Sequence, residues 1–192
     1  MKLNESIPQN RFFPLYYLEM RKSLLIVIDY QNDFVNGSLG FESASKLEGK
    51  IIDFIEAKEK EGFEVVFTKD IHEDNYLDTV EGKNLPIPHC IKGSKGEQIY
   101  GKLKEVASRH LIFEKETFGS LELANYIAKG DYKDIILCGI DTSICVLSNA
   151  ILAKAASPSS NIFIASSCSG SGDLEAERIA YKALERVQIY KL

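Results

Sequence analysis

The stretch "IILCGIDTSICVLSNAI", residues 135–151, changes from a β-branched run to a helical pattern at a glycine, and a cysteine follows the change. Thr142 is a plausible helix N-cap, which would put Cys145 in the first helical turn. There the helix macrodipole favours a thiolate, and the unpaired amides of Ile144 and Cys145 could hold an oxyanion. Because most lone cysteines are small buried apolar residues, a nucleophile and an inert core thiol both remain open here.

A nucleophilic thiol needs a proton acceptor, and Asp29 could provide one. It ends the apolar run "SLLIVID" and could pass the proton of a neighbouring thiol to a leaving amine. Lys115, in "FEKETFGS", could keep Asp29 ionised and stabilise the thiolate electrostatically. The alternatives are a turn aspartate and a solvated surface lysine, both of which are common.

A second group of residues has the chemistry of metal ligands. In "KDIHEDNY", Asp70 and His72 are two positions apart and would point to the same side of an extended segment. His89 follows in "PIPHCIKG", and one carboxylate with two imidazoles suits Zn²⁺, Mn²⁺ or Fe²⁺. The alternative is a capped loop aspartate with two surface histidines, because D-x-H is a short pattern. His110, the remaining histidine, begins an apolar run and is interpreted as structural.

Buried strands must position these side chains, because the chain alternates short apolar runs with helical patterns. The alternation predicts βαβ units and an α/β three-layer sandwich with a mostly parallel, about six-stranded sheet. The predicted strands are residues 24–28, 65–67, 111–113, 135–137 and 162–165, with a weaker sixth in the final "VQIYKL". The predicted helices are residues 44–61, 96–108, 120–129, 142–156 and 173–186.

In an open parallel sheet, ligands bind outside the carboxyl ends of the strands. Asp29, Asp70, Lys115 and Cys145 each come at or after the end of a predicted strand, so the sheet should gather acid, amine and thiol on one rim. Residues 70–95 form one long irregular stretch, and a loop of that length in a compact domain is usually functional.

The composition is that of a globular protein, with 192 residues, 45% hydrophobic and 27% charged. The net charge of −5 and the interleaved acids and bases argue against a nucleic-acid partner. Four cysteines without a C-x-x-C spacing indicate free thiols in a reducing, cytoplasmic compartment. The N-terminal apolar piece is too short for a membrane span and has no cleavage site of a signal peptide. We expect an extension over residues 1–19, whose role the sequence leaves open, and one domain over residues 20–192.

These motifs resemble those of the isochorismatase-like cysteine hydrolases, and among them the nicotinamidases. "IVIDYQNDFVNGSL" is similar to the family's first-strand signature, "FEKETFGS" to its lysine segment and "CGIDTSICV" to its nucleophile loop. The three motifs come in the family's order from about residue 21 onward. The resemblance implies a catalytic triad of Asp29, Lys115 and Cys145, and the cysteine implies an amidase rather than a true isochorismatase.

The segments "KDIH" and "PHCIKGSKG" resemble the nicotinamidase metal loop, which implies that Asp70, His72 and His89 bind a divalent metal, Zn²⁺ in the first place. In the family, this metal binds the pyridine nitrogen of the substrate. The resemblance also implies a cis peptide between Ile140 and Asp141. It further implies that both residues contact the substrate. Nicotinamidases often have a tryptophan shortly before the second histidine, where this chain reads "NLPIPHC". Phe34, in "QNDF", matches a ring-packing aromatic residue of the family.

The resemblance implies hydrolysis of a small carboxamide through a cysteine thioester, first of all nicotinamide to nicotinate and ammonia. One alternative is a related amide or ureide hydrolase with another substrate. A different class of function is a non-catalytic binding or thiol-switch domain that uses Cys138, Cys145 and Cys168, but it would leave Asp29 and Lys115 unexplained. The expected partner is a small-molecule amide, with no nucleic acid and no membrane, and the resemblance is compatible with a homo-oligomer.

Overall fold

The computed structural model describes residues 21–192 of the chain. The predicted extension over residues 1–19 and the predicted domain start at residue 20 lie outside the described residues. Among residues 21–192, no helix combines the length and the apolar character that crossing a membrane requires.

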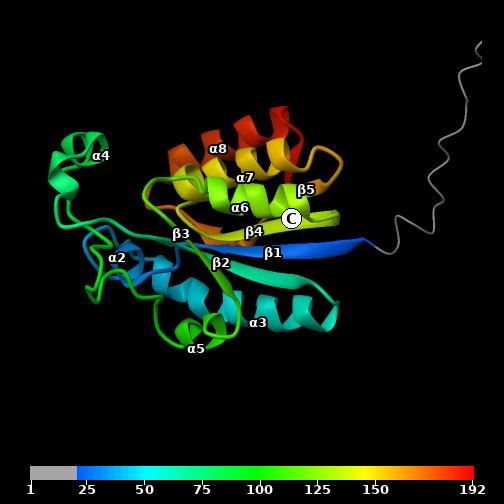
Figure 1. Ribbon diagram of the computed structural model, residues 1–192, viewed down its shortest axis with the longest axis horizontal. Helices are drawn as coiled ribbons and strands as arrows, with labels where there is room; N and C mark the ends of the chain where they lie inside the picture. Colours follow the sequence, from blue (N-terminus) through cyan, green and yellow to red (C-terminus); the bar gives the residue numbers. More distant parts are fainter. Residues whose placement is uncertain (1–20) are drawn as a thin grey trace, which may run out of the picture.

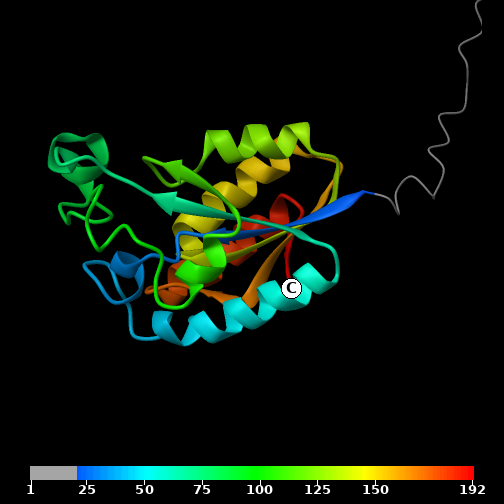
Figure 2. The ribbon, with the colours of Figure 1, turned by 60° about the horizontal axis from the view of Figure 1, so that its bottom comes forward.

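A six-stranded sheet forms the middle layer, with the strand order β3-β2-β1-β4-β5-β6 and every neighbouring pair parallel. Helices cover both of its faces, with α6, α7 and α8 on one side and α3 and α5 on the other (Figure 1). Figure 2 shows the same sandwich from below, with α3 running along the outside of the sheet. The predicted three-layer α/β architecture is confirmed. The strands are β1 (Lys22–Ile28), β2 (Glu64–Asp70), β3 (Leu111–Lys115), β4 (Tyr132–Ile140), β5 (Asn161–Gly170) and β6 (Ile189–Lys191).

The apolar runs are continuous because each central strand is buried on both faces. In β1, Leu24, Ile26 and Ile28 belong to the core under α6, α7 and α8, whereas Leu25 and Val27 belong to the core over α3 and α5. Side chains alternate across a strand, so one run of five apolar residues supplies both cores. The larger helices are α3 (Leu47–Lys60), α6 (Leu121–Lys129), α7 (Leu147–Ala156) and α8 (Leu174–Arg186).

Two predictions about the connecting segments are wrong. Residues 96–108 do not form one helix, because only α5 (Leu103–Ala107) is helical, while the carbonyls of Gly96 and Gln98 accept hydrogen bonds from α2 (Asn32–Val35). The stretch 70–95 is not irregular throughout. It contains a 3₁₀ turn, η2 (Tyr76–Asp78), and a short helix, α4 (Val80–Asn84), which stand out at one end of the molecule (Figure 1). A further 3₁₀ turn, η1 (Ala44–Lys46), precedes α3.

The site position follows from the strand order. The chain leaves β1 toward β2 and β3 on one side and returns to β4 on the other side, so the carboxyl ends of β1 and β4 flank a topological switch point. Ligands of open parallel sheets bind at such a point. Asp29 directly follows β1, and a π-helical turn, η3 (Thr142–Val146), follows β4 and carries Cys145.

Candidate active site

Lys115 lies at the centre of the buried polar cluster. Its Nζ is 2.7 Å from Oδ2 of Asp29, 2.9 Å from Oδ1 of Asp70 and 3.8 Å from Sγ of Cys145. The side chains of Lys115 and Asp29 are 2% and 0% exposed, and Cys145 is 6% exposed. The structure therefore brings the three predicted catalytic residues together, and it adds Asp70 to the same contact group.

The aspartate is held on both oxygens. The Oγ1 hydroxyl of Thr68 donates to Oδ1 of Asp29 at 2.6 Å and also accepts a hydrogen bond from the Asp29 amide. The main chain of Asp29 is in the left-handed region, with φ of 45°, directly after the end of β1. Burial raises the pKa of Asp29, although Lys115 opposes this shift.

Burial and the ion pairs of Lys115 set the pKa values of the groups in this cluster. Burial alone would lower the pKa of Lys115, but the acidic groups around it, Asp29 first, hold that pKa above its ordinary value. Burial raises the pKa of Cys145 well above its ordinary value, and Lys115 offsets this only in part. The helix macrodipole therefore does not by itself make Cys145 a thiolate at neutral pH, and a base has to take its proton.

The nucleophile turn is fixed from both sides. Oδ1 of Asp141 accepts from the Ser143 amide at 2.7 Å, so Asp141 is the N-cap and the prediction of Thr142 as the N-cap is wrong. Thr142 is instead the first residue of the turn, and its buried hydroxyl has no hydrogen-bond partner among residues 21–192. On the other side, the buried amide of Asn149 donates to the Cys145 carbonyl at 2.8 Å.

The join between strand and turn has the predicted backbone. The peptide between Ile140 and Asp141 is cis. Gly139 has φ of 112°, and a Cβ there would overlap the carbonyl oxygen of Ile28 in the neighbouring strand. Only glycine fits this close approach. The contact is with Ile28, the last residue of β1, which directly precedes Asp29.

One of the two amides expected to form an oxyanion hole already has a main-chain partner. The amide of Ile144 donates to the Asp141 carbonyl at 3.2 Å, so it is not unpaired as the sequence led us to expect. This bond is long, because main-chain N–H···O bonds most often span about 2.9–3.0 Å. An oxyanion at this position would have to share or replace it.

The three predicted metal ligands converge next to the catalytic cluster. Oδ2 of Asp70 is 2.8 Å from Nε2 of His72 and 3.4 Å from Nε2 of His89, and one donor atom of each residue lies within 4.8 Å of the others. All three residues are buried. Nδ1 of His89 is 2.8 Å from the Ile87 carbonyl, which leaves Nε2 free to bind a metal.

Two observations indicate that Asp70, His72 and His89 are suited to bind a divalent cation. Within the part of the chain that the structure describes, the buried Nε2 of His72 forms no hydrogen bond of acceptable geometry, although it lies 2.8 Å from Oδ2 of Asp70. Burial alone would raise the pKa of Asp70, but His72, His89 and Lys115 hold it well below its ordinary value, so Asp70 is a carboxylate. A carboxylate and two imidazoles with one orphaned nitrogen form a donor set for Zn²⁺ and related ions.

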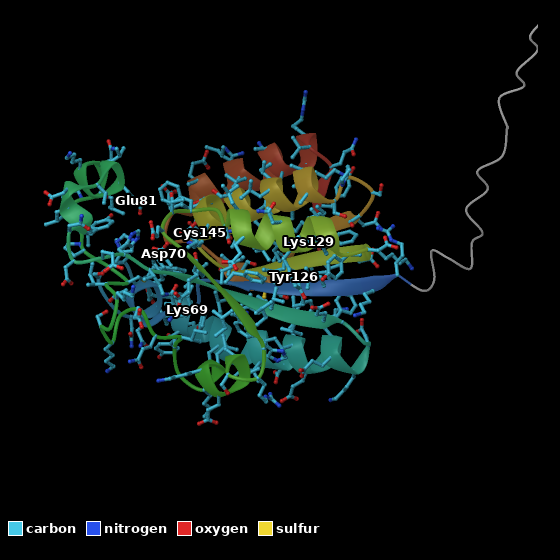
Figure 3. All side chains as sticks on the ribbon, viewed as in Figure 1. Lys69, Asp70, Glu81, Tyr126, Lys129 and Cys145 are labelled. Atoms are coloured by element: carbon cyan, nitrogen blue, oxygen red, sulfur yellow. The ribbon has the colours of Figure 1, made fainter. Side chains whose placement is uncertain are left out.

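Glu81 is a residue of this site that the sequence analysis missed. Its Oε1 is 3.7 Å from Nε2 of His72 and 3.8 Å from Nε2 of His89, so it offers a further oxygen to the same position. Figure 3 shows Glu81, Asp70 and Cys145 toward the same end of the molecule. Glu81 lies on α4, inside the stretch predicted to be irregular, and no local spacing marks it.

A cavity of about 220 Å³ is lined by Cys145 and by two of the three predicted metal ligands, Asp70 and His89. Its wall includes the predicted substrate residues Phe34, Ile140 and Asp141, and the Phe34 ring lies 5.4 Å from the His89 ring. Most of the remaining wall is apolar, which suits a small ring. The other lining residues are Leu39, Phe41, Asp70, Glu81, Leu85, His89, Phe118, Ile144, Cys145 and Gly172.

Comparisons with known proteins agree with this geometry. The profile of the isochorismatase domain matches residues 23–190. An isochorismatase family protein of Bacillus subtilis (strain 168), PncA, is 31% identical over 142 residues, which cover 68% of this chain and 77% of that protein. A nicotinamidase/pyrazinamidase of Mycobacterium tuberculosis (strain ATCC 25618 / H37Rv) is 27% identical over 141 residues, or 66% and 75% of the two chains.

Among solved structures, the crystal structure of the nicotinamidase PncA from Bacillus subtilis is similar, with a TM-score of 0.76 and 28% identity. The likeness covers 88% of this chain and 98% of that one, so it includes the sheet and both helix layers. The domain match begins within β1 and ends within β6, so it includes most or all of each strand. The chain belongs to the isochorismatase family.

Proposed function

We propose that this protein hydrolyses a small carboxamide through a cysteine thioester, with nicotinamide as the substrate and nicotinate and ammonia as the products. The observation that carries the proposal is the position of Lys115 Nζ, 2.7 Å from Asp29 and 3.8 Å from Cys145. A buried amine that holds a carboxylate next to a thiol is a device for moving the thiol proton. Relatives named nicotinamidase support the choice of substrate.

The steps follow from the residues in the cluster. Asp29 takes the proton of Cys145, and the sulfur attacks the carboxamide carbon. The amides of Ile144 and Cys145 hold the oxyanion, for which the Ile144 amide shares its bond to Asp141. Asp29 gives the proton to the leaving ammonia, then takes a proton from the water that cleaves the thioester and returns it to the sulfur of Cys145. The positive charge of Lys115 offsets the negative charge that Asp29 and Cys145 carry in turn during this proton transfer.

Substrate binding would use both ends of the cavity. Phe34 packs against the ring, and Ile140 and Asp141 form the wall next to the thiol. Asp70, His72 and His89 hold a divalent metal, with Glu81 as a further oxygen donor. The donor set favours Zn²⁺, with Mn²⁺ or Fe²⁺ as alternatives. When bound, the metal would supply a Lewis acid for the pyridine nitrogen of the substrate.

Two broader properties belong to the same proposal. All four cysteines are free and buried, which supports a reducing cytoplasmic compartment and gives no support to a thiol switch. We also propose that the protein forms a homo-oligomer, and this part of the proposal rests on the family resemblance alone. The domain boundary near residue 20 also remains a proposal.

The experiment is ammonia release from a panel of amides by the purified protein. Nicotinamide and pyrazinamide should be hydrolysed, whereas N-carbamoyl compounds should not. If nicotinamide is untouched while another amide or a ureide is turned over, the nicotinamidase proposal fails but the thiol chemistry stands. If no amide or ureide in the panel releases ammonia, the hydrolase proposal itself fails.

A further inference from the structure

The side chain of Gln31 connects the two segments that carry Asp70 and His89. Gln31 is 0% exposed and lies two positions after Asp29. Its Nε2 donates to the carbonyl of Asp70 at 2.8 Å, and its Oε1 accepts from the amide of Asp70 at 2.7 Å. One side-chain amide therefore holds both main-chain groups of a proposed metal ligand. The catalytic steps make no use of Gln31.

The same amide reaches the loop that contains the second histidine. Nε2 of Gln31 also donates to the Glu97 carbonyl at 2.8 Å and lies 3.4 Å from Sγ of Cys90, the residue after His89. The carboxylate of Asp33 accepts from the Cys90 amide at 2.7 Å. The loop after His89 is thus attached to the segment that follows Asp29.

The loop after His89 packs tightly against residues 31–33, which fixes the distance between the two segments. A Cβ at Gly96 would overlap the carboxylate of Asp33, so the loop lies against the 31–33 segment without a spacer. The main chain of His72 pairs separately with the loop, through bonds of 3.0 Å to Cys90 and 2.8 Å from Lys92. Asp70 has its main-chain amide and carbonyl on Gln31 instead. The position of Asp70 relative to His89 therefore depends on Gln31.

We infer that Gln31 is a positioning residue that sets the separation between Asp70 and His89 and thereby tunes the affinity and coordination of the metal. The inference rests on the proposed metal site. Gln31 does not contact the metal position, and it acts through the main chain of one ligand and the loop of another. Groups of this kind outside the ligands typically change metal affinity by about 10- to 100-fold when removed.

The test measures metal binding by the metal-free full-length protein, with Co²⁺ followed by its visible absorption and Zn²⁺ by competition. Gln31→Met keeps the length of the side chain and removes all its hydrogen bonds. We expect its Kd for both ions to rise about 10- to 100-fold, with a changed absorption band of the saturated Co²⁺ complex. Asn32→Ala is the matched control, because Asn32 donates to the same loop at Lys95 but does not contact Asp70. Its Kd should stay within about two-fold and its Co²⁺ band should be unchanged.

Thermal melting of the metal-free proteins identifies a temperature at which every variant is folded, and binding is measured there. A purely structural role would lower the melting temperature and leave the Kd and the Co²⁺ band of the folded protein unchanged. That result overturns the role of Gln31 and leaves the metal site standing. Absence of Co²⁺ binding by the wild type overturns the metal site and this inference together. If Gln31→Met does not fold, Gln31→Glu replaces it, because it keeps the acceptor for the Asp70 amide and removes the donor. A Kd and a Co²⁺ band equal to those of the wild type would then overturn the role of Gln31.

Discussion

Asp70 joins the two halves of the site through its ion pair with Lys115. Oδ1 of Asp70 is 2.9 Å from Nζ of Lys115, while Oδ2 lies 2.8 Å from Nε2 of His72. One carboxylate thus contacts the catalytic amine with one oxygen and the proposed metal ligands with the other. In the proposed mechanism Asp70 serves both metal binding and thiol chemistry, so a variant that alters metal binding should also alter the rate of amide hydrolysis.

Lys115→Met should remove both the catalysis and part of the stability. It leaves Asp29 and Asp70 as two buried carboxylates without their cation. Breaking a buried ion pair by removing one partner typically costs about 3–5 kcal/mol of unfolding free energy. We expect ammonia release to fall by about 1000-fold or more, as when a member of a catalytic unit is lost.

Steady-state kinetics and urea denaturation check this result. Lys92→Met is the control, because Lys92 forms a salt bridge with Glu73 in which both side chains are 62% exposed. Exposed pairs contribute about 0–1 kcal/mol, so this variant should resemble the wild type. A Lys115→Met enzyme with wild-type turnover would contradict the role given to the amine.

Glu81→Gln should weaken metal binding and leave the fold intact. Glu81 lies on the short helix α4, away from the sheet, and only its carboxylate approaches the two histidines. We expect the Kd for Zn²⁺ to rise about 10-fold or more, with little change in melting temperature of the metal-free protein. Glu73→Gln is the control, since Glu73 is exposed and pairs with Lys92. Equal Zn²⁺ affinity in Glu81→Gln and the wild type would exclude Glu81 as a ligand.

Gly139→Ala should destabilise the protein and disturb the site. The new Cβ would overlap the Ile28 carbonyl, and φ of 112° is a strained conformation for alanine. We expect a loss of at least about 1–3 kcal/mol in unfolding free energy, together with reduced activity because Asp29 follows Ile28 directly.

The matched control for this variant is Gly49→Ala, in the first turn of α3, where a Cβ meets nothing within 4 Å. Replacing an exposed helical glycine by alanine gains up to about 1 kcal/mol. Urea denaturation should therefore give opposite signs for the two glycines. A stabilised, fully active Gly139→Ala would show that the strands do not approach as closely as described.

Stability should fall as the pH rises above about 8.5, where unfolded cysteines ionise. Burial raises the pKa of all four thiols, Cys90, Cys138, Cys145 and Cys168, so the folded protein keeps their protons longer than the unfolded chain does. The unfolded state then binds fewer protons, and each such thiol lowers the unfolding free energy by about 1.4 kcal/mol per pH unit.

Urea denaturation at about pH 8 and pH 10 tests this, with Cys138→Ala expected to have a slope smaller by about 1.4 kcal/mol per pH unit. Ile136→Val, a core change in the same strand, should lower stability equally at both pH values. Equal slopes for Cys138→Ala and the wild type would contradict the raised pKa of that thiol.

The sequence predicted the sheet and the rim well because both depend on local patterns. Continuous apolar runs identified the strands, and the end of each strand identified Asp29, Lys115 and Cys145. Thr68 could have been found in the same way, since it lies two positions before Asp70 and so on the same face of β2. The helix over residues 96–108 failed because bonds to a distant segment hold its first part.

Other features depend on contacts that no local pattern contains. Glu81 approaches the histidines only because the fold places α4 beside His72 and His89, and Asn149 reaches the Cys145 carbonyl from the following helix. Asp141 replaced Thr142 as the N-cap because its carboxylate also accepts from Ser171 at 2.7 Å. These positions become visible only when the tertiary structure is formed.

The most direct test of the account is the rate of ammonia release from nicotinamide by Cys145→Ala, compared with Cys138→Ala as a control thiol buried in β4. We predict that Cys145→Ala loses activity by about 1000-fold or more while remaining folded, because the proposed thioester forms on the sulfur of Cys145. Cys138→Ala should keep its activity. Wild-type turnover by Cys145→Ala would contradict the central claim that this thiol is the nucleophile.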